Sequence, residues 1–147
     1  MKSEVDAFLA KYDPPIVKLA QAARKKLRAR LPHAFELVYD NYNALVFGFG
    51  PTERAGDALF SIALYPRWVT LFFLRGASLR DPHNLLKGSG KIVRHYVLKD
   101  ASDLDRPEIV ALMEQALAKS DVPWTDAKGR LVIKSISAKQ RARRPTR

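Results

Sequence analysis

The residues best suited to chemistry follow an apolar run that starts at Trp68. A glycine turn, Gly88-Ser89-Gly90-Lys91, is followed at once by Arg94 and His95. Free backbone amides of such a turn, next to cations, are typical of a nest that holds an anion. We therefore predict a groove for an anionic ligand. Its predicted lining is Trp68, Arg75, Gly88, Ser89, Gly90, Lys91, Arg94 and His95.

The glycine turn does not match a nucleoside-triphosphate loop. Ile92 follows Lys91 where that motif needs Ser or Thr, and the residues after it favour a strand instead of a helix. The simpler alternative to an anion nest is an ordinary glycine turn that leads into a strand.

Arg94 and His95 are predicted to lie on opposite faces of the strand that follows the turn, because side chains alternate along a strand. Arg94 shares its face with Ile92 and Tyr96, which are apolar or aromatic. A buried arginine needs a partner, since an unpaired buried charge is costly. We expect a salt bridge to Asp81 or Asp40, with a ligand anion as the alternative.

Metal and catalytic motifs are weak in this sequence. His33, His83 and His95 show no metal-ligand spacing, and Asp81 in Asp81-Pro82-His83 is better explained as a turn or cap residue than as a hard-metal ligand. Ser89 lacks the flanking glycines of a nucleophile elbow, and no His-Glu-x-x-His pattern occurs. We predict no catalytic residue, no metal ligand and no cofactor, and favour a non-enzymatic role.

The composition is that of a folded domain. Of 147 residues, 47% are hydrophobic and 28% are charged, and there is no cysteine to form a disulfide or a thiolate site. No apolar run reaches the ~18 residues of a membrane span. The first residues are acidic in part and do not resemble a signal peptide. We expect a cytoplasmic protein that does not bind membranes.

The net charge of +11 is unevenly distributed. Residues 128–147 contain eight Lys or Arg and no acid, and residues 14–31 contain six and no acid. The rest of the chain has 12 basic and 15 acidic side chains. The positive excess is therefore predicted to lie on one helix and on a basic, flexible tail at 138–147, outside a domain spanning 1–137.

Hydrophobic periodicity predicts the elements that position these residues. Helices are predicted at 4–11, at 14–31 and from Pro107 to near Ser120. Strands are predicted at 35–39, 44–49, 58–65, 69–74 and 92–98, with one more at 129–136. Short links between successive strands indicate an antiparallel meander. The predicted fold class is α+β, with two layers: a mainly antiparallel sheet of five or six strands and helices on one face.

Residues 71–82, 85–91 and 94–95 together resemble the YdhG-like family of uncharacterised domains. The resemblance covers roughly residues 5–118. It implies a small two-layer domain with an antiparallel sheet and no established activity for most members, although some relatives are described as frataxin-like iron chaperones. Tyr39-Asp40-Asn41-Tyr42 stands here in place of the family's usual Gly-Met-Pro element.

Three functions follow as hypotheses. The first is a non-catalytic binding module for an anionic small molecule or protein partner. The second is a nucleic-acid-associated protein that uses basic residues of the second helix and the tail. Those residues are Lys25, Lys26, Arg28, Arg141, Arg143 and Arg144. The third is an intracellular iron chaperone that uses Asp100, Asp103, Asp105 and Glu108. The sequence leaves the oligomeric state open.

Overall fold

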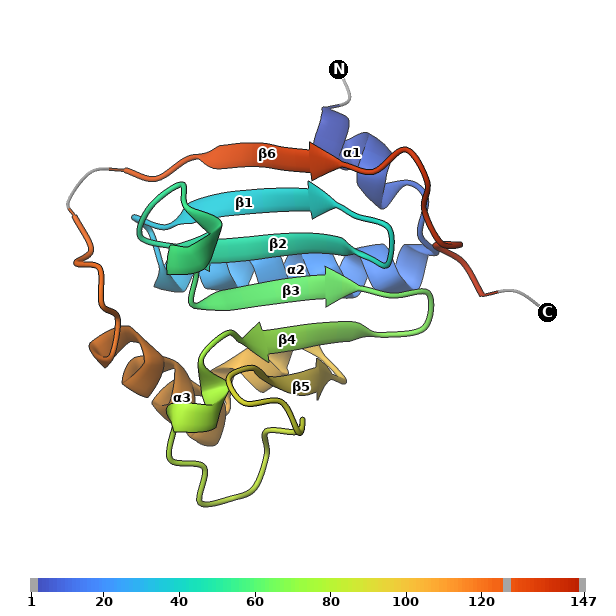
Figure 1. Ribbon diagram of the computed structural model, residues 1–147. Helices are drawn as coiled ribbons and strands as arrows, with labels where there is room; N and C mark the ends of the chain where they lie inside the picture. Colours follow the sequence, from blue (N-terminus) through green and yellow to red (C-terminus); the bar gives the residue numbers. More distant parts are fainter. Residues whose placement is uncertain (1–2, 126–127, 146–147) are drawn as a thin grey trace.

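The computed structural model describes residues 3–125 and 128–145 of the chain. It is an α+β fold in which helices cover one face of a six-stranded sheet (Figure 1). The helices are α1 (Glu4–Leu9), α2 (Pro14–Arg30) and α3 (Pro107–Ala118), with 3-10 turns η1 (Ala55–Asp57), η2 (Gly76–Ser78) and η3 (Ala101–Asp105). The strands are β1 (Phe35–Asp40), β2 (Leu45–Gly50), β3 (Phe60–Leu64), β4 (Val69–Phe73), β5 (Arg94–Leu98) and β6 (Leu131–Ile136).

The sheet has the strand order β5-β4-β3-β2-β1-β6. Strands β1 to β5 pair antiparallel with their neighbours in sequence, which confirms the predicted meander. Strand β6 pairs parallel with β1. The chain reaches β6 after crossing from β5 through α3, and a crossover of this length is what a parallel partner requires.

Helix α1 begins with a capping box. Ser3 Oγ accepts a hydrogen bond from the Asp6 amide, and the Asp6 carboxylate accepts one from the Ser3 amide, both at 3.1 Å. Helix α2 begins with Pro14 in its first turn, where a missing N–H is tolerated. The side chain of Asp13, just before this helix, makes no cap bond and pairs instead with Arg144.

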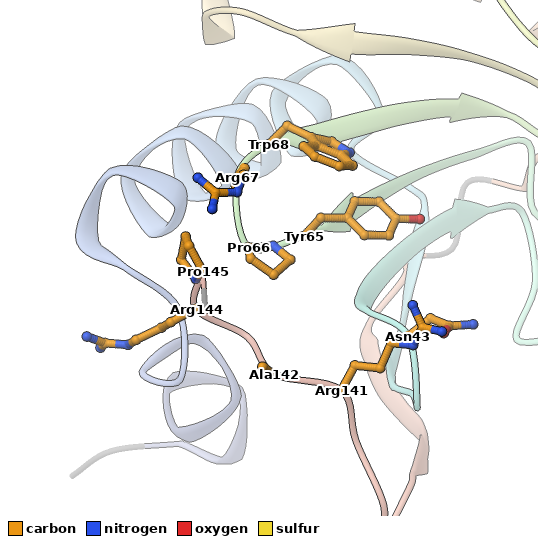
Figure 2. Close-up of a pocket in the computed structure, with 9 residues that line it drawn as sticks. All are labelled: Asn43, Tyr65, Pro66, Arg67, Trp68, Arg141, Ala142, Arg144 and Pro145. Atoms are coloured by element: carbon orange, nitrogen blue, oxygen red, sulfur yellow. The ribbon is translucent and has the colours of Figure 1, made fainter. Parts of the chain in front are cut away.

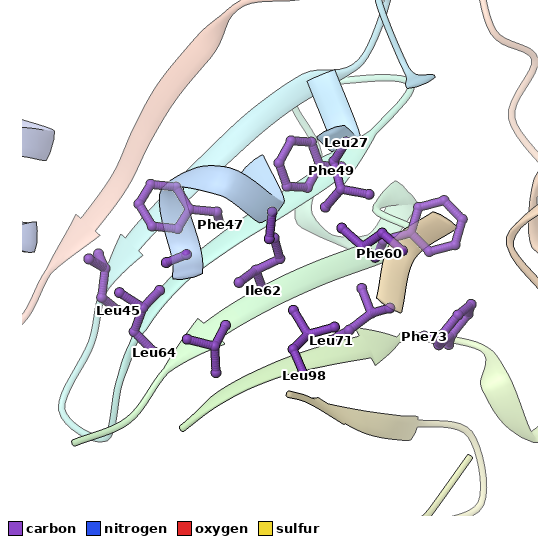
Figure 3. Close-up of a cluster of buried hydrophobic side chains, with 14 of the residues drawn as sticks. Leu27, Leu45, Phe47, Phe49, Phe60, Ile62, Leu64, Leu71, Phe73 and Leu98 are labelled. Atoms are coloured by element: carbon purple, nitrogen blue, oxygen red, sulfur yellow. The ribbon is translucent and has the colours of Figure 1, made fainter. Parts of the chain in front are cut away.

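The core lies between the helices and one face of the sheet (Figure 3). Phe47, Ile62 and Leu71 occupy one row across β2, β3 and β4, and all three are fully buried. Phe60 and Phe73 meet edge to face at 5.6 Å between ring centroids. Such rings contribute about 1 kcal/mol beyond their buried area, so they hold β3 and β4 firmly in register.

The face turned away from the helices contains two full rows of side chains, which the strand register defines. One row is Leu37, Gly48, Ser61, Phe72 and His95, and the other is Tyr39, Val46, Ala63, Thr70 and Val97. We call these ten residues the open face. Neither row contains Asp or Glu.

The acidic residues before α3 form their own short element. Asp100 and Asp103 cap the 3-10 turn η3 reciprocally, and α3 begins afterwards at Pro107, as predicted. Strand β5 begins two residues later than predicted, because Ile92 and Val93 are exposed in the preceding loop.

We predict that Gly76→Ala destabilises the junction between β4 and β5. A Cβ at Gly76 would lie 2.6 Å from Arg94 Cβ and 3.0 Å from Phe73 Cβ. Overpacking of this kind costs about 1–3 kcal/mol in the free energy of unfolding, which chemical denaturation measures. Gly90→Ala is the matched control, because nothing lies within 4 Å of its added Cβ. Equal stability of the two variants would contradict this account.

Candidate anion-binding site

The predicted groove is divided between two ends of the sheet. Trp68 precedes β4 and Arg75 follows it, and the register pairs Val69 with Leu98 and Phe73 with Arg94. Trp68 therefore lies about 17 Å or more along the strand from Arg75 and Arg94. The structure does not bring these eight residues together, because the length of β4 separates Trp68 from the others. The prediction relied on closeness in sequence and did not take that length into account.

The predicted salt bridge of Arg94 is also corrected. Its guanidinium donates to the carbonyls of Gly90 and Val93, the latter at 2.9 Å. The Asp81 carboxylate instead accepts hydrogen bonds from the backbone amides of Leu85 and Leu86, as expected of a turn residue. Arg94 is satisfied by loop carbonyls that wrap around it, so no carboxylate is needed.

The other predicted groove residues hold the loop beside β5. Lys87 and His95 exchange two backbone hydrogen bonds of 2.8 Å, which extend the sheet edge. Gly88 has a φ of +124°, a backbone conformation that side chains disfavour. Arg75 pairs with Asp121 at 2.6 Å. These contacts are those of an ordinary glycine turn, and an anion held by the exposed Ser89 and Lys91 stays a prediction.

The prediction of a flexible basic tail outside the domain is the one that the structure changes most. Residues 138–145 run back against the domain, beside the β1–β2 turn and the β3–β4 turn (Figure 1). Arg143 is only 5% exposed, and its Nη2 donates to Asp40 Oδ1 at 3.1 Å and to the Asn41 carbonyl. The positive charge at this position is therefore inside the fold. Residues 146–147 lie outside the described part of the chain.

Asp40 is the centre of this attachment. Its carboxylate is 1% exposed and accepts from Lys11 Nζ at 2.7 Å as well as from Arg143. Gln140 donates to the Asp40 carbonyl and accepts from Lys11. Burial alone raises the pKa of Asp40, but the hydrogen bonds from Lys11, Gln140 and Arg143 outweigh it and leave the pKa below its ordinary value.

Arg144 attaches the same segment to the helices. Its guanidinium donates to the carbonyls of Ala10, Lys11 and Tyr12 at 3.2–3.3 Å and pairs with Asp13. The last carbonyls of a helix have no partner within it, so the end of α1 offers ready acceptors. The chain after β6 is thus fixed at two successive arginines.

A pocket of about 730 Å³ forms where this segment meets the β3–β4 turn (Figure 2). Its lining is Asn43, Tyr65, Pro66, Arg67, Trp68, Arg141, Ala142, Arg144 and Pro145. The Tyr65 and Trp68 rings lie 5.6 Å apart with their planes 31° from parallel. Trp68 is 45% exposed, so one large aromatic surface is free to receive a ligand.

The pocket is cationic. Among the described residues, those that line it include three arginines and no Asp or Glu. Arg144 is directed away from Tyr65 and Trp68 toward its carbonyl partners (Figure 2). Arg67 and Arg141 have no carboxylate partner among residues 3–125 and 128–145, and the Arg141 guanidinium lies 5.6 Å from the Tyr42 ring. Burial raises the pKa of Tyr65, so its phenol is neutral at physiological pH.

The cations predicted to bind nucleic acid are mostly used inside the protein. Lys26 pairs with Asp105, and Arg28 pairs with Glu36. Arg143 and Arg144 are held as described above. Of the six residues in that prediction, Lys25 and Arg141 alone lack a carboxylate partner within the described chain. Four of the six cations of α2 take part in ion pairs, but they share two carboxylates, Glu36 and Asp105, so α2 keeps a positive excess.

The carboxylates predicted to bind iron are engaged as caps and ion pairs. The carboxylates of Asp100 and Asp103 accept hydrogen bonds from backbone amides, those of Ser102 and Lys99 respectively. Asp105 forms ion pairs with Lys26 and Arg30, and Glu108 forms one with Arg106. In the part of the chain that the structure describes, no three His, Asp or Glu side chains gather as a metal site. The structure gives the iron hypothesis no support.

Comparison of the chain with family models, with curated proteins and with solved structures finds no match. The YdhG-like resemblance stays a prediction. No helix among the described residues is long and apolar enough to cross a membrane.

Sequence reasoning found Trp68 and Arg141 but missed their neighbours Tyr65, Arg67 and Asn43. The available signal was the turn Tyr65-Pro66-Arg67-Trp68, in which two aromatic rings flank a cation. Their position beside the C-terminal segment depends on Arg143 reaching Asp40 across a separation of 103 residues, which no local pattern indicates.

We predict that Asp40→Asn lowers the free energy of unfolding by about 3 kcal/mol, because it leaves Arg143 buried without a carboxylate. Urea denaturation measures the change. Arg130→Gln is the control: it removes the ion pair with Glu53, whose two side chains are 67% and 45% exposed, and should cost under about 1 kcal/mol. Similar losses in both variants would mean that the buried pair has no special weight.

The same carboxylate gives an acid dependence of stability. A pKa lowered in the folded state means that its contribution is complete above the unfolded value of 3.8 and is lost as the pH falls through the lower folded value. Unfolding measured from neutral pH down to about pH 2 should therefore show a steeper acid loss in the wild type than in Asp40→Asn. Identical acid slopes would contradict the assignment.

Proposed function

We propose that this protein is a non-catalytic binding module for an anionic small molecule that carries a flat ring, of the nucleoside-phosphate class. The pocket between the β3–β4 turn and the C-terminal segment is its site. The observation that supports this most directly is the Tyr65–Trp68 pair beside Arg67 and Arg141, two arginines without a carboxylate partner in the described chain.

Each part of such a ligand has a partner in the pocket. A planar base stacks on the exposed face of Trp68, and stacking between flat rings is favourable whatever the base. A phosphate accepts hydrogen bonds from the guanidinium groups, whose forked geometry suits it. The volume of about 730 Å³ lies within the range of small-molecule sites.

The lining groups are suited to binding and poorly suited to proton transfer. Arginine stays protonated at any physiological pH, and the raised pKa of Tyr65 keeps its phenol neutral. The proposal therefore assigns no catalytic role to this pocket. It assumes the cytoplasmic location expected from the sequence, where nucleoside phosphates are abundant.

We predict that adenosine monophosphate binds and that Arg67→Gln combined with Arg141→Gln weakens its affinity about tenfold or more, because two phosphate contacts are lost. Titration calorimetry measures the affinity. Trp68→Ala should weaken the affinity for adenosine monophosphate by a similar factor and leave the affinity for inorganic phosphate unchanged.

The control is Lys25→Gln, which removes a positive charge on α2 away from the pocket and should leave the affinity unchanged. The proposed function would be overturned if the wild type did not bind adenosine monophosphate, or if the wild type and the double arginine variant bound it equally well.

A further inference from the structure

A second aromatic pair lies on the open face, beyond the pocket. The Phe72 and His95 rings are 5.9 Å apart with their planes 54° from parallel. Phe72 lies four residues after Trp68, so both side chains project from the same side of the β4 chain, about 13 Å apart. The Tyr65 amide donates to the Trp68 carbonyl, which continues the β3–β4 ladder to the pocket. The two aromatic pairs therefore share one surface.

The surface between the two pairs is uncharged. Ala63 and Thr70 face each other across β3 and β4 and are buried, with exposed fractions of 1% and 3%, so their larger neighbours form the surface here. Val97 borders them on β5 and is 45% exposed. A ligand chain that leaves the pocket therefore meets Val97 and other uncharged side chains before it reaches Phe72 and His95.

The charge of this surface suits a polyanion. Neither row of the open face contains Asp or Glu. Arg67 and Arg141 are at the pocket end of the surface, and Lys87 lies next to His95 at the other end. Cations therefore stand at both ends, with aromatic rings beside them.

We infer that the open face binds single-stranded nucleic acid, with one base on Tyr65 and Trp68 and a later base on Phe72 and His95. The inference rests on the proposed function, because the pocket receives the first nucleotide. Every base offers a flat ring and every nucleotide a negative charge, so this pattern of rings and cations recognises a single strand without reading its sequence. A duplex keeps its bases stacked inside and offers no free ring to the sheet.

The test is fluorescence anisotropy with a labelled single-stranded DNA of about ten nucleotides, at about 50 and 200 mM salt. The oligonucleotide should bind at least tenfold more tightly than adenosine monophosphate. His95→Ala should lower the affinity for the oligonucleotide about tenfold and leave the affinity for adenosine monophosphate unchanged, whereas Trp68→Ala should lower both affinities. Ile136→Ala is the control, because this apolar side chain is 54% exposed on β6, outside the open face.

The outcomes separate the inference from the proposed function. If adenosine monophosphate binds and the oligonucleotide binds no more tightly, the inference is wrong and the proposed function stands. If neither binds, both are wrong. Equal affinity for the duplex of the same sequence, or equal competition by a polyglutamate peptide, would overturn the inference by showing that charge alone governs binding. Binding of both ligands, with the oligonucleotide at least tenfold tighter and its affinity lowered in Trp68→Ala and His95→Ala, supports the inference. Oligonucleotide binding without any binding of adenosine monophosphate would overturn the proposed function and, with it, the inference.

Discussion

The buried carboxylate of Asp40 is the contact on which the rest of the structure depends. It joins the link between α1 and α2, through Lys11, to the end of β1 and to the C-terminal segment, through Arg143. Two buried charges are stable only when they are well paired and hydrogen-bonded. Gln140 and the Asn41 carbonyl add hydrogen bonds around the pair, and only Nε of the Arg143 guanidinium is left without a partner in the described part of the chain. The segment held in this way forms one wall of the pocket, so the site exists because the ion pair does.

Local pattern was sufficient for most of the fold. The helices follow apolar residues at helical spacing, and the meander follows from strands joined by short turns; both depend on residues close together in sequence. The parallel pairing of β6 with β1 could not be predicted from local pattern, since Leu131 pairs with Glu36 only after the chain has crossed the whole domain. The attachment of Arg143 has the same origin: a run of arginines is equally compatible with a solvated tail and with a buried ion pair.

Two residues of the candidate site were singled out from the sequence, but for different sites. Cations next to a glycine turn indicated an anion groove that included Trp68, and Arg141 was assigned to a nucleic-acid surface instead. The glycine turn attracted attention because it lies close to Arg94 and His95 in sequence, yet Arg94 is satisfied by its own loop. Which rings share a surface is decided by strand register and by which end of a strand they occupy, and neither is visible in a single segment.

The local excess of positive charge at the pocket has a consequence for kinetics. Arg67 and Arg141 line the pocket and have no carboxylate partner in the described part of the chain. An anion that diffuses past is therefore drawn toward this end of the sheet before it makes contact. Attraction during diffusion, and not contact strength alone, would then set how often an encounter is productive.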